Sequence, residues 1–313
     1  MGRWILLVCI LGLALGGCGR PQAGRLTSRL QNQSIIDGRP VKERESAASR
    51  SVVLVELLDL DNNRLGFCTG TLIEEHFVLT AAHCFDLSRI PQLRKFNILF
   101  VNALKEKSPA VTRKGTTYSL HSQFNSQSSI DHDIAVAMYQ GSTPQGFAPI
   151  AYDTDSKANY SSRIVYVYGY GRTKDYTGQR GQDTWATIGE LHRGVMLIDN
   201  NYNRFADRYL TQTASETFLC QGDSGGPQFY HEKGVLKLIG INSGVFGRKL
   251  ANGQHSCKGM GQATKVAPFA PWIKKEVTAI KRKYWYTYEE PQEEAPRLPT
   301  EGFETTVSSD LEI

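Results

Sequence analysis

The chain has 313 residues, 40% of them apolar, and its net charge at pH 7 is +5. That length allows a substantial core, and because all-β and α/β units can reach about 250 residues, we expect one catalytic domain with extensions. The charge is uneven: residues 288–313 have a net charge of −7, so residues 1–287 carry +12. Because the basic residues of the body are scattered, we expect no nucleic-acid binding.

The first 18 residues have the pattern of an export signal. Arg3 precedes an apolar run from Trp4 to Leu15 that is too short to span a bilayer comfortably. The run ends in Leu15-Gly16-Gly17-Cys18, which resembles a bacterial lipobox, so that Cys18 would become a lipidated N-terminus and a membrane anchor. Ordinary secretion is the alternative. We therefore expect a cell-envelope or outer-membrane lipoprotein, or otherwise a periplasmic or secreted protein.

The segments that flank the body are polar. Residues 19–34 are rich in Gly, Gln and Ser and lack a hydrophobic period, which indicates a spacer or propeptide. The folded body is expected over residues 35–287. Residues 288–313 are rich in Glu, Pro, Thr and Ser and are predicted to be disordered, because they cannot bury enough apolar surface to offset their ordering entropy.

The apolar segments of the body are short, and Gly, Asn and Asp separate them, which indicates an antiparallel all-β sandwich or barrel rather than βαβ units. The expected strand segments are Val52 to Leu57, Gly70 to Thr80, Phe96 to Val101, Ile134 to Tyr139, Ile164 to Tyr168 and Val235 to Asn242. One helix is expected from Ala270, because Ile273, Val277, Ile280 and Tyr284 fall on one helical face.

Four cysteines remain when the two in the signal segment are set aside, and an even number in an exported chain predicts two disulfides. Pairing neighbours in sequence joins Cys68 to Cys84 and Cys220 to Cys257. Each bond is worth about 3 to 4 kcal/mol if it acts by restricting the unfolded chain. A metal site is disfavoured because the sequence has no CxxC or HExxH motif, and no cofactor is expected.

The most specific motif surrounds a serine with glycines, which exposes the serine hydroxyl on a tight turn. It reads Cys220-Gln221-Gly222-Asp223-Ser224-Gly225-Gly226-Pro227. Acyl transfer by a serine needs two backbone N–H donors at the point where the carbonyl oxygen becomes negative. Gly222 and Ser224 are the expected donors, and they would form an oxyanion hole.

A serine is a poor nucleophile at neutral pH and needs an imidazole base that a carboxylate orients. The candidate base is His83, in the motif Thr80-Ala81-Ala82-His83-Cys84. The candidate carboxylate is Asp133, which precedes an apolar segment where low dielectric would strengthen its hydrogen bond. Asp131 is the weaker candidate. The other six histidines lack such a motif, and we interpret them as surface or core residues.

Taken in the order His83, Asp133, Ser224, these motifs resemble the trypsin-like (chymotrypsin-fold) serine protease family from Ile35 to about Lys283. Further matches are Gly66 to Ile73, Gly169 to Arg172, Thr264 to Val266 and Pro271 to Ile273. The resemblance implies two antiparallel six-stranded β-barrels with the triad at their junction, closed by a C-terminal helix. It also implies hydrolysis of protein or peptide substrates through an acyl-enzyme.

The resemblance further implies an activation step. Cleavage before Ile35 would free an ammonium that pairs with Asp223 and locks the serine loop. Ser34 and Asp37 depart from the family's pattern at this bond, so we do not expect a trypsin-like activator.

For substrate specificity, Phe218 stands where trypsin has an aspartate at the floor of the primary pocket. A buried Arg or Lys side chain would lack a counter-charge there, so we expect no preference for basic residues. The expected walls are Ser243-Gly244-Val245 and Gly261-Gln262, around a small or medium apolar side chain. Ser243 would also donate a hydrogen bond to Asp133.

Two other functions remain open at the level of sequence. A catalytically silent binding module on a protease scaffold is the main alternative, because a fold never proves a function. An esterase with the same triad is disfavoured because the chain order typical of lipases is missing.

Overall fold

The computed structural model describes residues 35–36, 38–104, 111–125, 131–176, 188–214 and 216–284. All of them belong to one compact unit, Asn32–Ile313. The predicted signal segment with Cys18, the spacer and the acidic tail lie outside the described residues. Within the described part of the chain, no helix is long and apolar enough to cross a bilayer.

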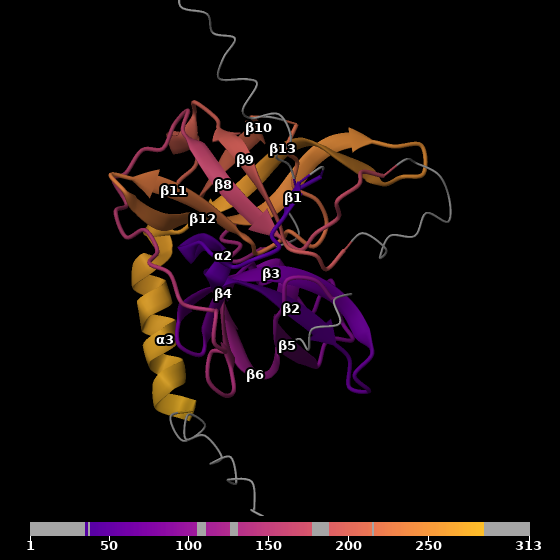
Figure 1. Cartoon of the computed structure of the whole chain (residues 1–313), viewed down its shortest axis with the longest axis vertical. Coiled ribbons are helices and arrows are strands. Elements are labelled where there is room, and N and C mark those ends of the chain that lie inside the picture. Colours follow the sequence, from indigo (N-terminus) through magenta and orange to yellow (C-terminus); the bar gives the residue numbers. More distant parts are fainter. Residues whose placement is uncertain are drawn as a thin grey trace, which may run out of the picture. The chain divides into compact units, whose positions relative to one another are not determined.

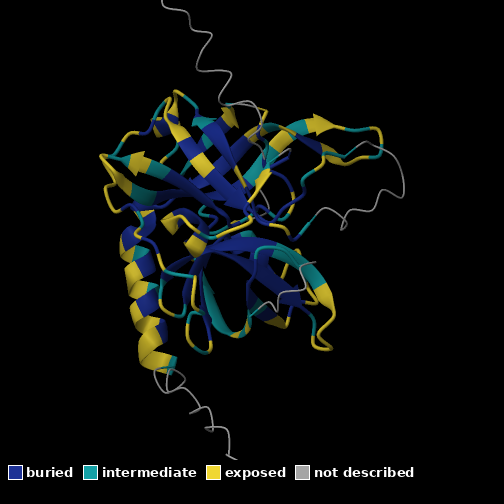
Figure 2. Cartoon of the chain, viewed as in Figure 1, coloured by how far each residue is buried: buried dark blue, intermediate teal, exposed yellow. Residues whose placement is uncertain are grey.

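The first barrel closes through antiparallel pairing in the order β2-β3-β4-β7-β6-β5 (Figure 1). Its strands are β2 Val52–Leu58, β3 Arg64–Glu74, β4 Phe77–Thr80, β5 Lys95–Phe100, β6 Val111–Leu120 and β7 Ala135–Tyr139. Every residue of β2, β4 and β7 is buried, which explains why their sequences are nearly continuous apolar runs (Figure 2).

The second barrel has the order β9-β10-β13-β12-β11-β8, and pairing between β8 and β9 closes it. Its strands are β8 Ile164–Gly169, β9 His192–Ile198, β10 Arg208–Thr213, β11 Pro227–Glu232, β12 Val235–Lys249 and β13 His255–Lys265. The short strand β1, Arg39–Pro40, extends the sheet along β9. The expected pair of six-stranded antiparallel barrels is therefore confirmed.

The C-terminal helix α3, Ala270–Tyr284, follows the second barrel in sequence but contacts β7 of the first. Ile273, Val277 and Ile280 form its buried face, as the helical spacing predicts. Ser119 on β6 donates a 2.8 Å hydrogen bond to Glu276 of the helix. The helix therefore fastens the end of the chain to the first barrel.

Short helices lie outside the barrels, namely α2 Ala47–Ser51, η1 Ala82–Phe85, η2 Tyr202–Arg204 and η3 Ala267–Phe269. The predicted segment Gly70 to Thr80 is wrong as a single strand: the chain reverses after Glu74, and His76 takes a left-handed φ of 68° before β4 begins. The predicted segment Val235 to Asn242 continues as β12 to Lys249, because it pairs with β13 along that length.

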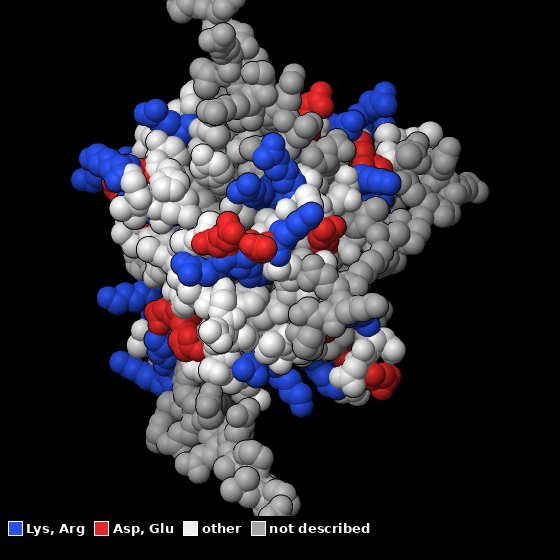
Figure 3. Space-filling model, viewed as in Figure 1, with Lys and Arg blue, Asp and Glu red and all other residues white. Residues whose placement is uncertain are grey.

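Both predicted disulfides, Cys68–Cys84 and Cys220–Cys257, are present. On the face of the molecule in Figure 3, Lys and Arg side chains are spread over the surface and interspersed with Asp and Glu.

Candidate active site

The three predicted catalytic residues come from both barrels. His83 lies in η1 directly after β4, and Asp133 lies just before β7. Because β4 and β7 are paired, from Phe77 with Met138 to Thr80 with Ala135, the residues at their ends are neighbours. Ser224 lies on the loop between β10 and β11 of the second barrel.

Asp133 holds His83 at two points. Its Oδ2 lies 2.7 Å from His83 Nδ1, and its Oδ1 accepts a 2.8 Å hydrogen bond from the His83 backbone N–H. Ser243 Oγ donates to the same Oδ2 at 2.6 Å, as the family resemblance implies. Complete burial favours the neutral acid, but the imidazole of His83 and these hydrogen bonds outweigh it, so the pKa of Asp133 is lowered. The carboxylate is therefore kept ionised beside the imidazole.

Asp131, the weaker candidate, is not part of this arrangement. It forms an ion pair with Arg208 on β10. Asp133 is thus the carboxylate that orients His83.

Thr69 on β3 fastens the serine loop to the first barrel. Its backbone N–H donates to Ser224 O, and its hydroxyl donates to Gly222 O, both at 2.8 Å. Thr69 follows Cys68, whose disulfide partner Cys84 is the residue after His83. One short stretch of β3 therefore restrains both the histidine and the serine.

The two expected N–H donors belong to peptide groups whose carbonyls are hydrogen-bonded. Gln221 O accepts from Arg172 N at 2.9 Å, and Asp223 O accepts from Gly226 N at 3.0 Å. In a planar trans peptide the N–H points opposite to the C=O, so these bonds fix the N–H directions of Gly222 and Ser224. Neither N–H is bonded to any described residue.

Gly222 has a φ of 97°, a left-handed conformation that glycine adopts without strain. A Cβ at this position would also lie 2.8 Å from Gly171 Cα. The turn that presents Ser224 therefore requires glycine.

Asp223 has a fully buried carboxyl group. It accepts hydrogen bonds from Gly171 N at 2.9 Å and from Cys220 N at 2.8 Å. Burial raises its pKa to about 7, although these two bonds lower it in part. No described cationic side chain is paired with it. Glycines at 169 and 171 make room, because a Cβ at either would lie within 2.5 Å of Asp223 Oδ1.

Ile35 and Ile36 are buried close to the segment that leads into the serine loop. Ile36 N donates to Phe218 O at 3.2 Å, and Ile36 packs in one cluster with the Cys220–Cys257 disulfide and Phe218. Ile36, the neighbour of the predicted N-terminus Ile35, therefore lies beside the segment from Phe218 to Cys220 that leads to Asp223.

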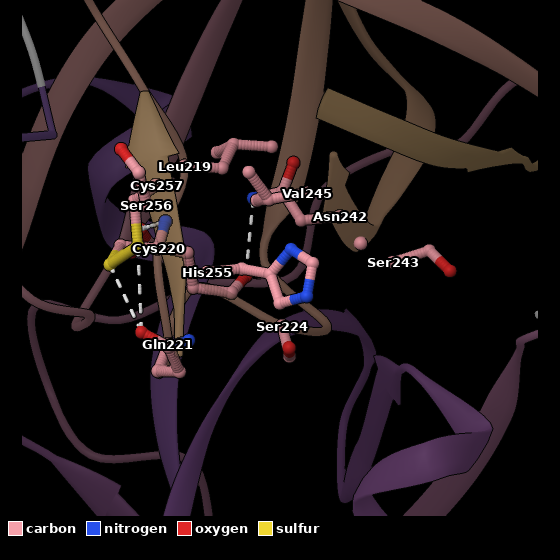
Figure 4. Close-up of a pocket in the computed structure, with 12 residues that line it drawn as sticks. Leu219, Cys220, Gln221, Ser224, Asn242, Ser243, Val245, His255, Ser256 and Cys257 are labelled. Carbon is pink, nitrogen blue, oxygen red and sulfur yellow. Dashed lines mark hydrogen bonds between the residues drawn. A yellow bond between two sulfur atoms is a disulfide. The ribbon is translucent and has the colours of Figure 1, made fainter. Parts of the chain in front are cut away.

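A cavity of about 130 Å³ opens beside Ser224 (Figure 4). Ser243 and Val245, both predicted pocket residues, line it together with Leu219, Gln221, Asn242 and His255. Among the described residues that line it, the one carboxylate is Asp223, which backbone N–H groups already engage.

Phe218 and Gly261 are not among the lining residues. Phe218 packs instead against Ile36, and the next residue, Leu219, lines the cavity. Gly261 lies behind that leucine, because a Cβ there would be 3.0 Å from Leu219 Cδ1. Leu219 therefore lines the cavity, while Phe218, the predicted floor, and Gly261, a predicted wall residue, do not.

His255 lines the cavity although its sequence context predicts only a surface or core residue. His255 is exposed, and its Nδ1 lies 3.1 Å from Gly247 O across the β12–β13 hairpin. The signal in the sequence is its place two residues before Cys257, because the disulfide to Cys220 brings that segment to the serine loop.

Comparison with known proteins agrees with this geometry. Residues 36–273 match the family model described as Trypsin, which covers most of the chain. The chain belongs to the trypsin family. A curated relative is serine proteinase stubble of Drosophila melanogaster, 27% identical over 228 residues that make up 67% of this chain. The match spans only 27% of that relative. Trypsin family membership and two disulfides fit an exported protein.

Proposed function

We propose that the protein is a serine endopeptidase, with Ser224 as nucleophile, His83 as general base and Asp133 as the carboxylate that orients the base. The observation that carries the proposal is the buried Asp133, which binds His83 Nδ1 and leaves Nε2 as the nitrogen that can take a proton. His83 takes the hydroxyl proton as Ser224 attacks a peptide carbonyl, and then gives it to the leaving amine as the C–N bond breaks and the acyl-enzyme forms. Water, activated by the same imidazole, then hydrolyses the acyl-enzyme and frees Ser224.

The N–H groups of Gly222 and Ser224 would stabilise the oxygen that becomes negative during this attack. The bonds that Gln221 O and Asp223 O accept support this role, because they hold both peptide groups before substrate arrives.

For the primary cavity we propose small or medium apolar side chains. Leu219 and Val245 give it apolar walls, and the carboxyl of Asp223 is already hydrogen-bonded by backbone. A basic side chain would therefore be buried without a counter-charge, which costs several kcal/mol. A peptide-library profile dominated by cleavage after Arg or Lys would contradict this assignment.

For activation we propose cleavage of the Ser34–Ile35 bond. Among the described residues no cation is paired with the buried Asp223 carboxyl, which supports this proposal because a freed ammonium at Ile35 would supply that charge. N-terminal sequencing of active enzyme tests it: Ile35 as the first residue is expected, and activity from a chain intact at this bond would contradict it.

For localisation we propose an exported protein whose uncleaved form is anchored through a lipidated Cys18; cleavage before Ile35 would release the body from that anchor. Palmitate labelling that disappears in the Cys18→Ala variant is expected. Labelling that persists in that variant, or none in the unaltered protein, would favour ordinary secretion instead.

The decisive experiment for the activity is labelling with a fluorophosphonate, which reacts only with an activated serine. Protein that begins at Ile35 should be labelled, and the Ser224→Ala and His83→Ala variants should not. If correctly cleaved protein is not labelled, a catalytically silent module on the trypsin scaffold becomes the better interpretation.

A further inference from the structure

A row of three buried polar side chains crosses the second barrel and ends at the serine loop. Tyr209 on β10, Gln228 on β11 and Asn242 on β12 are each no more than 2% exposed. Tyr209 Oη donates to Gln228 Oε1 at 3.0 Å, and Gln228 Nε2 donates to Asn242 Oδ1 at 3.0 Å. Asn242 Nδ2 then donates to the backbone carbonyl of Asp223 at 3.2 Å.

The direction of every bond in this row is determined. A backbone carbonyl can only accept, so the amide group of Asn242 must face Asp223 O. Asn242 Oδ1 then faces Gln228, which must donate from its Nε2. The other end of that amide, Gln228 Oε1, therefore accepts the hydrogen bond from the Tyr209 hydroxyl. Burial raises the pKa of Tyr209 well above its usual value, which keeps that hydroxyl protonated. The row therefore holds the Asn242 Nδ2 group in one orientation, toward the backbone carbonyl of Asp223.

The carbonyl at the end of the row shares a peptide group with the Ser224 N–H. Because that group is planar, a donor that fixes the direction of Asp223 O also fixes the Ser224 N–H on the opposite side. Hydrogen bonding to a carbonyl also polarises the peptide group and makes its N–H a better donor. We propose that Asn242 is a positioning residue for the Ser224 oxyanion donor and that Gln228 and Tyr209 hold Asn242 in place; this rests on the proposed protease activity.

The surroundings of the row support a dedicated role. Tyr209 lies in a cluster of apolar residues that includes Ile198 and Ile239, where polar groups cost free energy unless they are fully hydrogen-bonded. Gly240 makes room for the phenol, because a Cβ there would lie 2.0 Å from Tyr209 Oη. Apolar side chains would fill this core without needing hydrogen-bond partners or a glycine at position 240.

The role can be separated from a purely structural one with two variants of the mature enzyme. Asn242→Leu removes the side-chain donor to Asp223 O, which keeps only its bond from Gly226 N, and leaves Gln228 with an unpaired buried amide. The triple variant Tyr209→Phe/Gln228→Met/Asn242→Leu removes all three polar groups together, so that no buried polar atom of the row is left unpaired. If the row only stabilises the fold, the triple variant should recover both stability and activity.

We expect kcat on a peptide amide to fall roughly tenfold to a hundredfold in both variants, with KM within about threefold of the original, because one of two oxyanion donors is misaligned. A peptide boronate, which forms a tetrahedral adduct with Ser224, should lose affinity in parallel. Tyr160→Phe is the matched control, since it removes another buried tyrosine hydroxyl of this barrel, one that donates to Asp153 instead. It should keep its kcat.

Unchanged kcat in Asn242→Leu, or recovery of kcat in the triple variant, would overturn the inference. Amide hydrogen exchange of the serine loop gives a readout that needs no activity: we expect faster exchange in Asn242→Leu at Gly226, whose N–H donates to Asp223 O. An inactive original protein would refute the proposed function instead, and unchanged exchange would in that case still overturn the positioning role of Asn242.

Discussion

Replacement of Asp223 by Asn in the uncleaved chain should abolish a pH dependence of stability that the buried carboxyl group imposes. Burial raises the pKa of Asp223 in the folded protein to about 7, from an ordinary value of 3.8. Between these two pH values the folded protein keeps a proton that the unfolded chain has lost. The stability that this group contributes is therefore fully present below about pH 4 and is lost as the pH rises through 7.

The magnitude follows from the pKa difference. One pH unit is worth about 1.4 kcal/mol while the folded group stays protonated, and the group is half ionised at pH 7. The unfolding free energy should therefore fall by about 2 kcal/mol between pH 5 and pH 7 and level off near pH 8. Urea unfolding at pH 5, 6, 7 and 8 measures this, with Ser224→Ala in both proteins to prevent self-cleavage. The difference between the protein that keeps Asp223 and the Asp223→Asn variant isolates this one group, because other titrating residues cancel.

The same measurement on protein that begins at Ile35 tests the activation proposal. A free ammonium beside Asp223 would stabilise the carboxylate and lower its pKa, so the fall between pH 5 and pH 7 should disappear. If the Asp-minus-Asn difference in the uncleaved chain stays constant from pH 5 to 8, the assignment of Asp223 as a buried carboxyl without a counter-charge is refuted.

Three further changes test the site. Asp133→Asn should lower kcat roughly 10⁴-fold with little change in KM, because His83 loses the acceptor that fixes its tautomer; a loss of less than about tenfold would contradict the triad. Thr69→Val should slow fluorophosphonate labelling about tenfold and lower the unfolding free energy by roughly 1 to 3 kcal/mol, because Gly222 O loses a buried donor. Unchanged labelling would contradict the role of Thr69 in holding the serine loop. The double variant Cys220→Ser/Cys257→Ser should lose about 4 kcal/mol of unfolding free energy, because the disulfide joins residues 37 apart in sequence. A urea-unfolding midpoint within error of the original would show that the disulfide does not constrain the unfolded chain.

The chemistry of the site could be predicted from sequence because it depends on short local motifs. Glycines around Ser224 and small residues before His83 are visible in the chain, and the disulfide pairing joins the histidine loop to β3. The helix α3 is predictable for the same reason, since four apolar residues at helical spacing need no knowledge of what they pack against. Buried strands with continuous apolar runs, such as β2, are predicted nearly to the residue.

Strands with mixed composition could not be predicted in this way. The strand β6 is Val111–Leu120, with the sequence VTRKGTTYSL, and it has no fully buried residue. Its place in the barrel depends on pairing with β5 and β7, which a local pattern cannot reveal. The lining of the cavity near Phe218 is equally hard to predict, because which of two adjacent apolar side chains faces the cavity depends on the packing of Ile36.

The groups that hold the proposed catalytic residues in place differ from the side chains that line the cavity. The catalytic geometry is fixed by backbone groups: the N–H of His83, the carbonyls of Gly222 and Asp223, and the peptide planes between them. Side chains such as Leu219 and Val245 touch the cavity without holding any of these groups. Substitutions there should alter which peptide binds while the labelling rate of Ser224 by a small fluorophosphonate stays the same. Asn242 is the exception, because it lines the cavity and also binds the loop, so a change at that position should slow the labelling of Ser224.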